Sequence, residues 1–318
     1  GKESVAQYEE ISSSFNDFKA MRFKGAVPPK TINPAQFRKM DDFSKLVAVT
    51  TAQALVESGL NLKKVDTSKV GILFTTPSGP VEVVEGIEKQ ITTEGYAHIS
   101  ASRFPFTVMN AAAGMLSIMF KIKGPLSVIS TNSGTIDGIQ YAKEMMRNDG
   151  LDYILLVSAH QWTDMSLMWW EQLGYDSQEY IGADYCSVQV LSRQATKDQS
   201  LVLGSKQLKY SGKTLDDITT IFDNSLQNLL SELGLTMQEI KGFVWNNRKK
   251  IDSLDYVYLS QLSERYQLSN LGQDQFSFSS NGAGEELDYI MNANLAEGYY
   301  LAISYSKFGG ISFAVIKK

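Results

Sequence analysis

The chain has 318 residues, 43% of them hydrophobic, and a formal net charge of −5. This length suits one large α/β domain or two fused halves, and the ordinary apolar fraction argues against long disordered stretches. The acidic balance argues against general nucleic-acid binding, which needs a basic face to neutralise phosphates. The polar N-terminus has no signal-peptide pattern, and no run approaches the ~18 apolar residues of a membrane span. We therefore expect a cytoplasmic protein with no membrane span.

Residues 1–39 are polar and are interrupted by Pro28-Pro29 and Asn33-Pro34, so they predict one short helix and an irregular lead-in. Residues 42–58 predict an amphipathic helix that is capped by Asp41 or Asp42 and ends before Gly59. Residues 69–75 predict a buried strand and residues 81–92 a helix. A further helix over residues 107–121 is apolar nearly all round, which predicts burial.

Residues 124–160 are the best-organised part of the sequence. A short β-branched run follows Gly124-Pro125 and predicts a buried strand, and the polar residues 131–134 predict a tight turn. Apolar residues then recur at helical spacing until Gly150, and residues 151–158 predict a second buried strand. This strand–turn–helix–strand order is typical of a parallel sheet. A side chain in the turn would face a helix N-terminus, which suits a nucleophile, but on periodicity alone the pattern favours an ordinary capped turn.

The rest of the chain repeats the alternation of strands and helices. Strands are predicted over residues 185–192, 201–210 and 243–245, and helices over residues 215–233, 253–266 and 285–296. Residues 299–305 and 311–316 predict a final hairpin. Arg248-Lys249-Lys250 is the one dense basic run, typical of a solvated loop and a possible docking point for an acidic carrier protein.

The chemistry-bearing residues are few. The single cysteine, Cys186, lies in an alternating strand, which predicts a small buried side chain and allows no internal disulfide. His98 and His160 are expected to be a loop residue and a structural residue. One cysteine and two scattered histidines give no metal-ligand spacing, and no Gly-rich phosphate motif is present, so we expect no metal or cofactor.

Three segments of the sequence resemble β-ketoacyl synthases, the condensing enzymes of the thiolase fold, and they follow one another along the chain as in that family. The first is Gly124-Pro125 with its turn and the helix containing Asp137-Gly138-Ile139. The second, Phe104-Pro105-Phe106-Thr107 with residues 110–114, is similar to the family segment just upstream. The third, residues 281–285 followed by Phe308-Gly309-Gly310, is similar to the family's Gly-Ala-Ala-Gly helix start and final turn. The resemblance implies an α/β, thiolase-like fold of duplicated βαβαβ halves, layered α-β-α-β-α, with halves at residues 1–200 and 201–318.

The sequence departs from this family at its catalytic positions. The nucleophilic cysteine of the family falls on Ser133 when counted from Gly124, or on Asn132 when counted back from Asp137. The two catalytic histidines fall near Asn246 or Asn247 and near Ser279 or Ser280. The resemblance thus implies that the Cys-His-His set is missing. A serine nucleophile would need an adjacent base, and no histidine is placed to serve.

A condensing-enzyme fold without its catalytic set resembles the chain-length factors of type II polyketide and polyene synthases. The resemblance implies a heterodimer with an active ketosynthase that elongates phosphopantetheine thioesters on an acyl carrier protein. Phe106, Met109 and Met115 are the candidate walls of its acyl tunnel. Two alternatives remain open: a divergent β-ketoacyl synthase or malonyl-carrier decarboxylase that uses Ser133, and a homodimeric acyl-binding protein.

Overall fold

The computed structural model describes residues 6–12, 18–131, 134–172, 181–194, 200–209, 214–245, 254–272, 285–306 and 310–318. Over these ranges strands alternate with helices, and the strands form three sheets. Among the described helices, none combines the length and the apolar character needed to cross a membrane.

A four-stranded sheet, in the order β4-β3-β5-β7, forms the centre of the N-terminal part. Strand β3 (Val70–Thr76) pairs in parallel with β4 (Leu126–Ser130) and β5 (Tyr153–His160), whereas β7 (Tyr185–Ser192) is antiparallel to β5. Helix α5 (Gly134–Asn148) connects β4 to β5, which confirms the predicted strand–turn–helix–strand unit. The helix packs closely on the sheet, because a Cβ added at Gly138 would lie 2.5 Å from a Leu156 methyl carbon.

A second four-stranded sheet, in the order β8-β11-β10-β9, is built from later residues. Its strands are β8 (Leu201–Lys209), β9 (Ile240–Val244), β10 (Tyr299–Ser306) and β11 (Gly310–Lys317). Strands β9 and β10 are parallel, and β11 is antiparallel to both of its neighbours. The predicted pairing of the last two strands is therefore confirmed.

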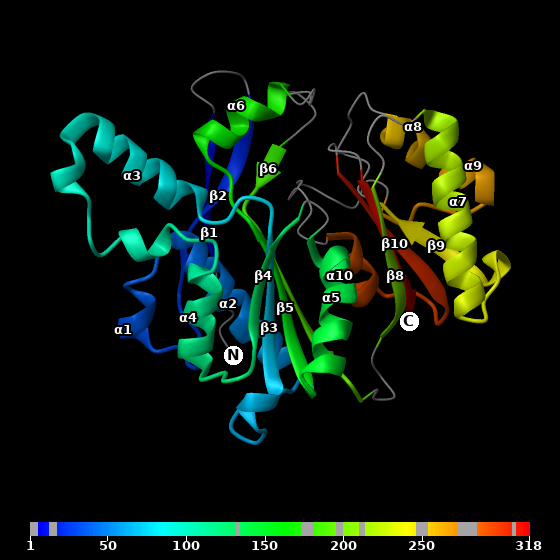
Figure 1. The fold of residues 1–318 in the computed structure, drawn as a ribbon, viewed down its shortest axis with the longest axis horizontal. Helices are drawn as coiled ribbons and strands as arrows, with labels where there is room; N and C mark the ends of the chain where they lie inside the picture. Colours follow the sequence, from blue (N-terminus) through cyan, green and yellow to red (C-terminus); the bar gives the residue numbers. More distant parts are fainter. Residues whose placement is uncertain are drawn as a thin grey trace.

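Helices and sheets alternate in five layers (Figure 1). Helices α2 (Asp42–Glu57) and α4 (Ala111–Phe120) cover the outer face of the first sheet. Helices α5 and α10 (Glu285–Asn292) lie between the sheets and share one apolar cluster with both. Helices α7 (Leu215–Glu232), α8 (Leu254–Ser260) and α9 (Leu262–Tyr266) lie on the far side of the second sheet (Figure 1). Both four-stranded sheets are thus covered by helices on their two faces, which explains their largely apolar strands.

The N-terminal region differs from the prediction of one short helix and an irregular lead-in. Strands β1 (Ala6–Ser12) and β2 (Lys19–Ala26) pair antiparallel, and β6 (Ile181–Ala183) extends this small sheet. The predicted short helix is α1 (Pro34–Phe37), capped by Asn33. The strands escape sequence analysis because β1 is almost entirely exposed, so its side chains do not alternate between apolar and polar.

Three helices differ from the predictions. Helix α4 has one buried face only, and Ile118 is 63% exposed, so the expected burial all round is wrong. The helix predicted over residues 253–266 is interrupted at Gln261, and α10 ends at Asn292 rather than residue 296. The remaining helices are α3 (Val81–Glu94) and α6 (Asp164–Gln172), with single 3-10 turns at Thr67–Lys69, Tyr96–His98, Phe104–Phe106 and Met237–Glu239.

The β5–β7 pair of the first four-stranded sheet corresponds to the β10–β11 pair of the second. Ser187 is the third residue of β7 and lies opposite Ser158 of β5, while Ser312 is the third residue of β11 and lies opposite Ser304 of β10. The two central helices also match, because the fourth residue of each, at positions 137 and 288, is an aspartate. Duplicated halves are therefore visible in the structure, down to equivalent polar side chains.

Candidate functional site

The predicted nucleophile turn lies where β4 ends and α5 begins. The parallel pairing of β3 with β4 places Thr76 beside Ser130, and the Thr131 amide donates to the Thr76 carbonyl oxygen, 3.2 Å away. Helix α5 starts at Gly134 with a φ of +46°, a conformation that favours glycine. The two candidate nucleophile positions, Asn132 and Ser133, lie outside the described residues.

Asp137 ties this turn to the second half of the molecule. Its two carboxylate oxygens accept hydrogen bonds from the Thr131 hydroxyl and from the Ser312 hydroxyl on β11. Burial raises the pKa of Asp137, and the two hydroxyl donors and the charge of Lys209 oppose that rise. The end of β4, the start of α5 and the start of β11, next to the predicted Phe308-Gly309-Gly310 turn, therefore meet at one carboxyl group.

A matching contact lies on the other central helix. Asp288 of α10 accepts hydrogen bonds from the Tyr185 hydroxyl at 2.6 Å and the Ser187 hydroxyl at 2.8 Å, both on β7, and from the Gln189 amide. Burial raises the pKa of Asp288 to about 6, against the effect of these three donors. Each central helix thus carries a carboxylate that binds the sheet of the opposite half.

The predicted histidine positions follow β9 and precede α10 in the chain. Asn246, Asn247, Ser279 and Ser280 lie outside the described residues, as does the basic run at positions 248–250. Their neighbours Val244, at the end of β9, and Glu285, at the start of α10, lie on elements that contact each other. The assignment of these positions stays a prediction.

The candidate tunnel residues come from the segment before β4. Phe106 and Met115 are half-buried, and Met115 packs against the core between α2 and the first sheet. Met109 is 38% exposed and lies against Gly79. Their role as tunnel walls stays a prediction.

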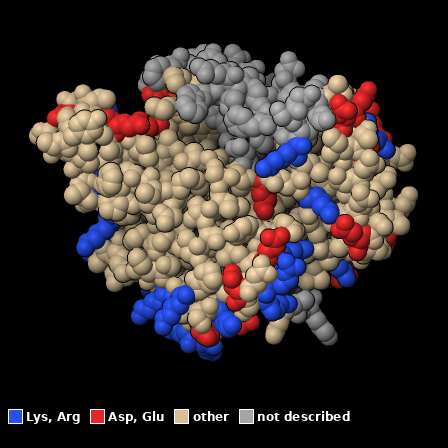
Figure 2. All heavy atoms as spheres, in the orientation of Figure 1, with Lys and Arg blue, Asp and Glu red and all other residues tan. Residues whose placement is uncertain are grey.

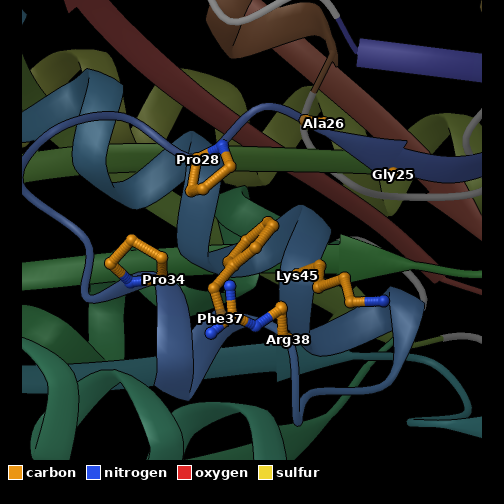
Figure 3. Close-up of a pocket in the computed structure, with 7 residues that line it drawn as sticks. All are labelled: Gly25, Ala26, Pro28, Pro34, Phe37, Arg38 and Lys45. Carbon is orange, nitrogen blue, oxygen red and sulfur yellow. The ribbon is translucent and has the colours of Figure 1, made fainter.

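A cavity of about 410 Å³ lies elsewhere, between the end of β2, α1 and α2 (Figure 3). Its apolar lining is Gly25, Ala26, Pro28, Pro34 and Phe37. Two cationic side chains, Arg38 and Lys45, complete the lining. The sequence gives no signal for this cavity, because its walls come from three separate elements.

The only thiol of the chain lies away from the predicted turn. Cys186 is on β7, opposite Ala159 of β5, and packs against the core of the first half. Burial raises the pKa of its thiol to about 12, so it stays protonated near neutral pH. His160 is buried at the end of β5 and lies edge-on to Trp162, with ring centroids 5.0 Å apart. His160 is buried in the core, whereas Cys186 is half-buried against the core and so is less enclosed than the predicted buried side chain.

A buried carboxylate fastens the small N-terminal sheet to β5. Asp184 accepts hydrogen bonds from the backbone amides of Trp162 at 2.6 Å and Phe23 at 3.1 Å. Burial raises its pKa to about 7, against the effect of these amides and of Arg22, which forms an ion pair with Glu82. The sequence alone does not identify this residue, because the two amides that donate to it lie 22 and 161 positions away along the chain.

The described part of the site contains hydroxyls and carboxylates but no thiolate. A hydroxyl attacks a thioester only when a base removes its proton, whereas a low-pKa thiol attacks unaided. In the described part of the turn the acceptor for such a proton is Asp137, which already accepts two hydrogen bonds. The geometry therefore suits holding the turn in place better than activating a nucleophile.

Residues 18–182, just over half of the chain, match the family model described as "Beta-ketoacyl synthase, N-terminal domain". A relative from Vibrio cholerae, "3-oxoacyl-[acyl-carrier-protein] synthase 2", is 26% identical over 51% of this chain and 39% of its own length. The protein of the same name from Coxiella burnetii is 26% identical over 45% of this chain and 35% of its own length. The chain thus matches little more than a third of these relatives' length.

Solved structures agree over more of the chain. The ishigamide ketosynthase/chain length factor gives a TM-score of 0.71 at 17% identity, covering 89% of this chain and 82% of its own. AntDE:AntF, a type II polyketide acyl carrier protein in complex with its ketosynthase, gives 0.71 at 15% identity, covering 96% and 88%. Identities this low show the fold alone, which is thiolase-like, as predicted. Together with the family-model match, these similarities establish that the chain is a member of the β-ketoacyl synthase family.

Proposed function

We propose that this chain is a non-catalytic ketosynthase-like subunit, a chain-length factor that pairs with an active ketosynthase and helps shape its acyl tunnel. The observation that carries the proposal is the position of the only thiol, Cys186, which is half-buried on β7 rather than set in the turn after β4. Neither histidine of the sequence occupies a predicted catalytic position. Condensation would then depend on the partner's nucleophile.

Exposed apolar side chains suited to such a partner come from the segment before β4. Large apolar side chains are exposed along residues 96–118, and we call this group the apolar surface; its members are Tyr96, Phe104, Val108, Met109 and Ile118. Strand β4 is the edge strand of its sheet in the described structure and borders a broad area without charged side chains (Figure 2). Exposed apolar patches and depletion of charge are typical of protein interfaces.

The rest of the proposal concerns the complex. The substrate would be the phosphopantetheine thioester of an acyl carrier protein, handled in the cytoplasm, with no cofactor bound by this chain. One of the structural neighbours is an acyl carrier protein in complex with its ketosynthase, which supports this choice. Met109 belongs to the apolar surface and is also a candidate tunnel wall, so Met109→Ala should lengthen the products of the complex.

Co-expression with a candidate active ketosynthase tests the pairing. We expect a one-to-one heterodimer by native mass spectrometry, with condensation that survives Ser133→Ala. Ile118→Glu should dissociate it, because it places a charge in the apolar surface. Val56→Glu is the matched control, since Val56 is 70% exposed on α2, outside that surface. A stable homodimer without partner would favour the acyl-binding alternative, and activity of the lone chain abolished by Ser133→Ala would favour the enzyme.

A further inference from the structure

The cavity between β2, α1 and α2 has the dimensions of a small-molecule site. Its volume of about 410 Å³ falls within the ~300–1,000 Å³ typical of ligand pockets. Pro28, Pro34 and the edge of the buried Phe37 ring form apolar walls (Figure 3). These apolar walls, together with the two cations of the lining, suit a ligand that has both an apolar part and a negative charge.

The walls are fixed before any ligand arrives. Phe37 is buried in the core of the first half, which anchors α1, and the Asn33 side chain caps the start of that helix. The loop before it is closed by a hydrogen bond from the Ile32 amide to the Pro29 carbonyl oxygen, 2.9 Å long. A preformed pocket loses little conformational entropy on binding.

The charge at the rim is positive although the chain is acidic. Between positions 24 and 45 the sequence carries five basic residues and two acidic ones. Lys45 is 2.8 Å from a carboxylate oxygen of Asp42, so part of its charge is balanced. The Arg38 side chain is exposed, and no ion pair with another described residue offsets its charge. An exposed guanidinium group without an ion-pair partner can bind a carboxylate through two parallel hydrogen bonds.

We propose that this cavity binds a small amphipathic carboxylate, with its apolar chain against Pro28, Pro34 and Phe37 and its carboxylate on Arg38. Lys45 adds a second cation to the lining, from a different helix (Figure 3). The concave apolar floor favours a small molecule over a flat acidic protein surface, which would use the exposed cations without entering the cavity. The binding is independent of the chain-length-factor role proposed above.

Titration calorimetry with octanoate tests the proposal on the whole chain. We expect saturable binding at one site, and much weaker binding of octan-1-ol, which has the same chain without the charge. Arg38→Gln should weaken octanoate binding roughly tenfold or more, the usual effect of losing a charge-assisted contact. Arg38 is exposed, so this variant is expected to fold normally. Arg38→Lys should recover part of the affinity.

Lys39→Gln is the matched control, because Lys39 is the exposed neighbour of Arg38 and does not line the cavity. It should leave octanoate binding unchanged. Equal loss in the two variants would mean diffuse attraction to a basic segment and would overturn the proposal. So would octan-1-ol binding as tightly as octanoate, or no octanoate binding up to its solubility limit, which would leave acidic protein docking as the use of these cations.

Discussion

Replacing Asp288 by Asn should change the pH dependence of stability more than stability itself. Burial raises the pKa of Asp288 from its ordinary 3.8 to about 6, so the folded protein holds this proton over a range in which the unfolded chain has released it. A group with a raised folded pKa stabilises the protein most below the unfolded value. That stability is lost as the pH rises through the folded pKa.

The magnitude follows from the shift. About two pKa units correspond to about 3 kcal/mol, so Asp288 should lower the free energy of unfolding by that amount between about pH 4 and pH 6. Asparagine does not titrate, so the difference between wild type and Asp288→Asn should fall by about 3 kcal/mol over this range and then stay constant. The size of the difference in unfolding free energy at any one pH depends on how well the asparagine amide replaces a carboxylate that accepts three hydrogen bonds.

Urea denaturation at half-unit steps from pH 4 to pH 8 measures this difference. Asp149→Asn is the control, because Asp149 is an exposed aspartate at the end of α5, outside the contact. Ser187→Ala removes one donor to the carboxylate and should move the loss of stability to higher pH. If the Asp288→Asn and wild-type profiles run parallel from pH 4 to pH 7, the contact between α10 and β7 does not have the protonation behaviour inferred here.

Three further changes have clear expected outcomes. Gly124→Ala should destabilise the protein by about 1–3 kcal/mol in thermal or urea unfolding, because the new Cβ would lie 2.3 Å from the Val70 carbonyl oxygen; Gly114→Ala, with open space around its Cβ, should instead be neutral or stabilising. Thr214→Ala removes the capping box of α7 and should cost about 1 kcal/mol, and no measurable cost would show that the cap is dispensable. Asp184→Asn should remove a loss of stability that wild type shows as the pH rises from about 4 to about 7, since burial raises the pKa of Asp184 to about 7; an unchanged pH profile would contradict that assignment.

The local parts of the fold follow well from the sequence. Helix α2 begins after Asp41, one of the two caps predicted for it. Helix α7 begins after Thr214, at the residue where the predicted apolar spacing starts. The unit from β4 to β5 was predictable because its strands are continuous apolar runs and its helix has a single apolar face. These signals are local, and each extends over fewer than twenty residues.

What the sequence did not reveal depends on distant partners. Strand β1 is exposed, so its pairing with β2 leaves no apolar period to detect. The sequence of α4 could not show that one of its faces is exposed, because exposed and buried apolar residues give the same pattern in a sequence. The hydrogen bond from Ser312 to Asp137 joins residues 175 positions apart, and it could be anticipated only by aligning the β5–β7 pair with the β10–β11 pair.

Asp137 and Asp288, the two carboxylates that bind the opposite half, also affect how such a chain can change during evolution. A duplicated protein usually lets its two copies diverge separately, but here each copy holds the central helix of the other. A substitution at position 137 acts on position 312, and one at position 288 acts on positions 185 and 187. Among homologues, substitutions should therefore be correlated across the two halves at these positions rather than within each half. The two copies are expected to diverge as a coupled pair.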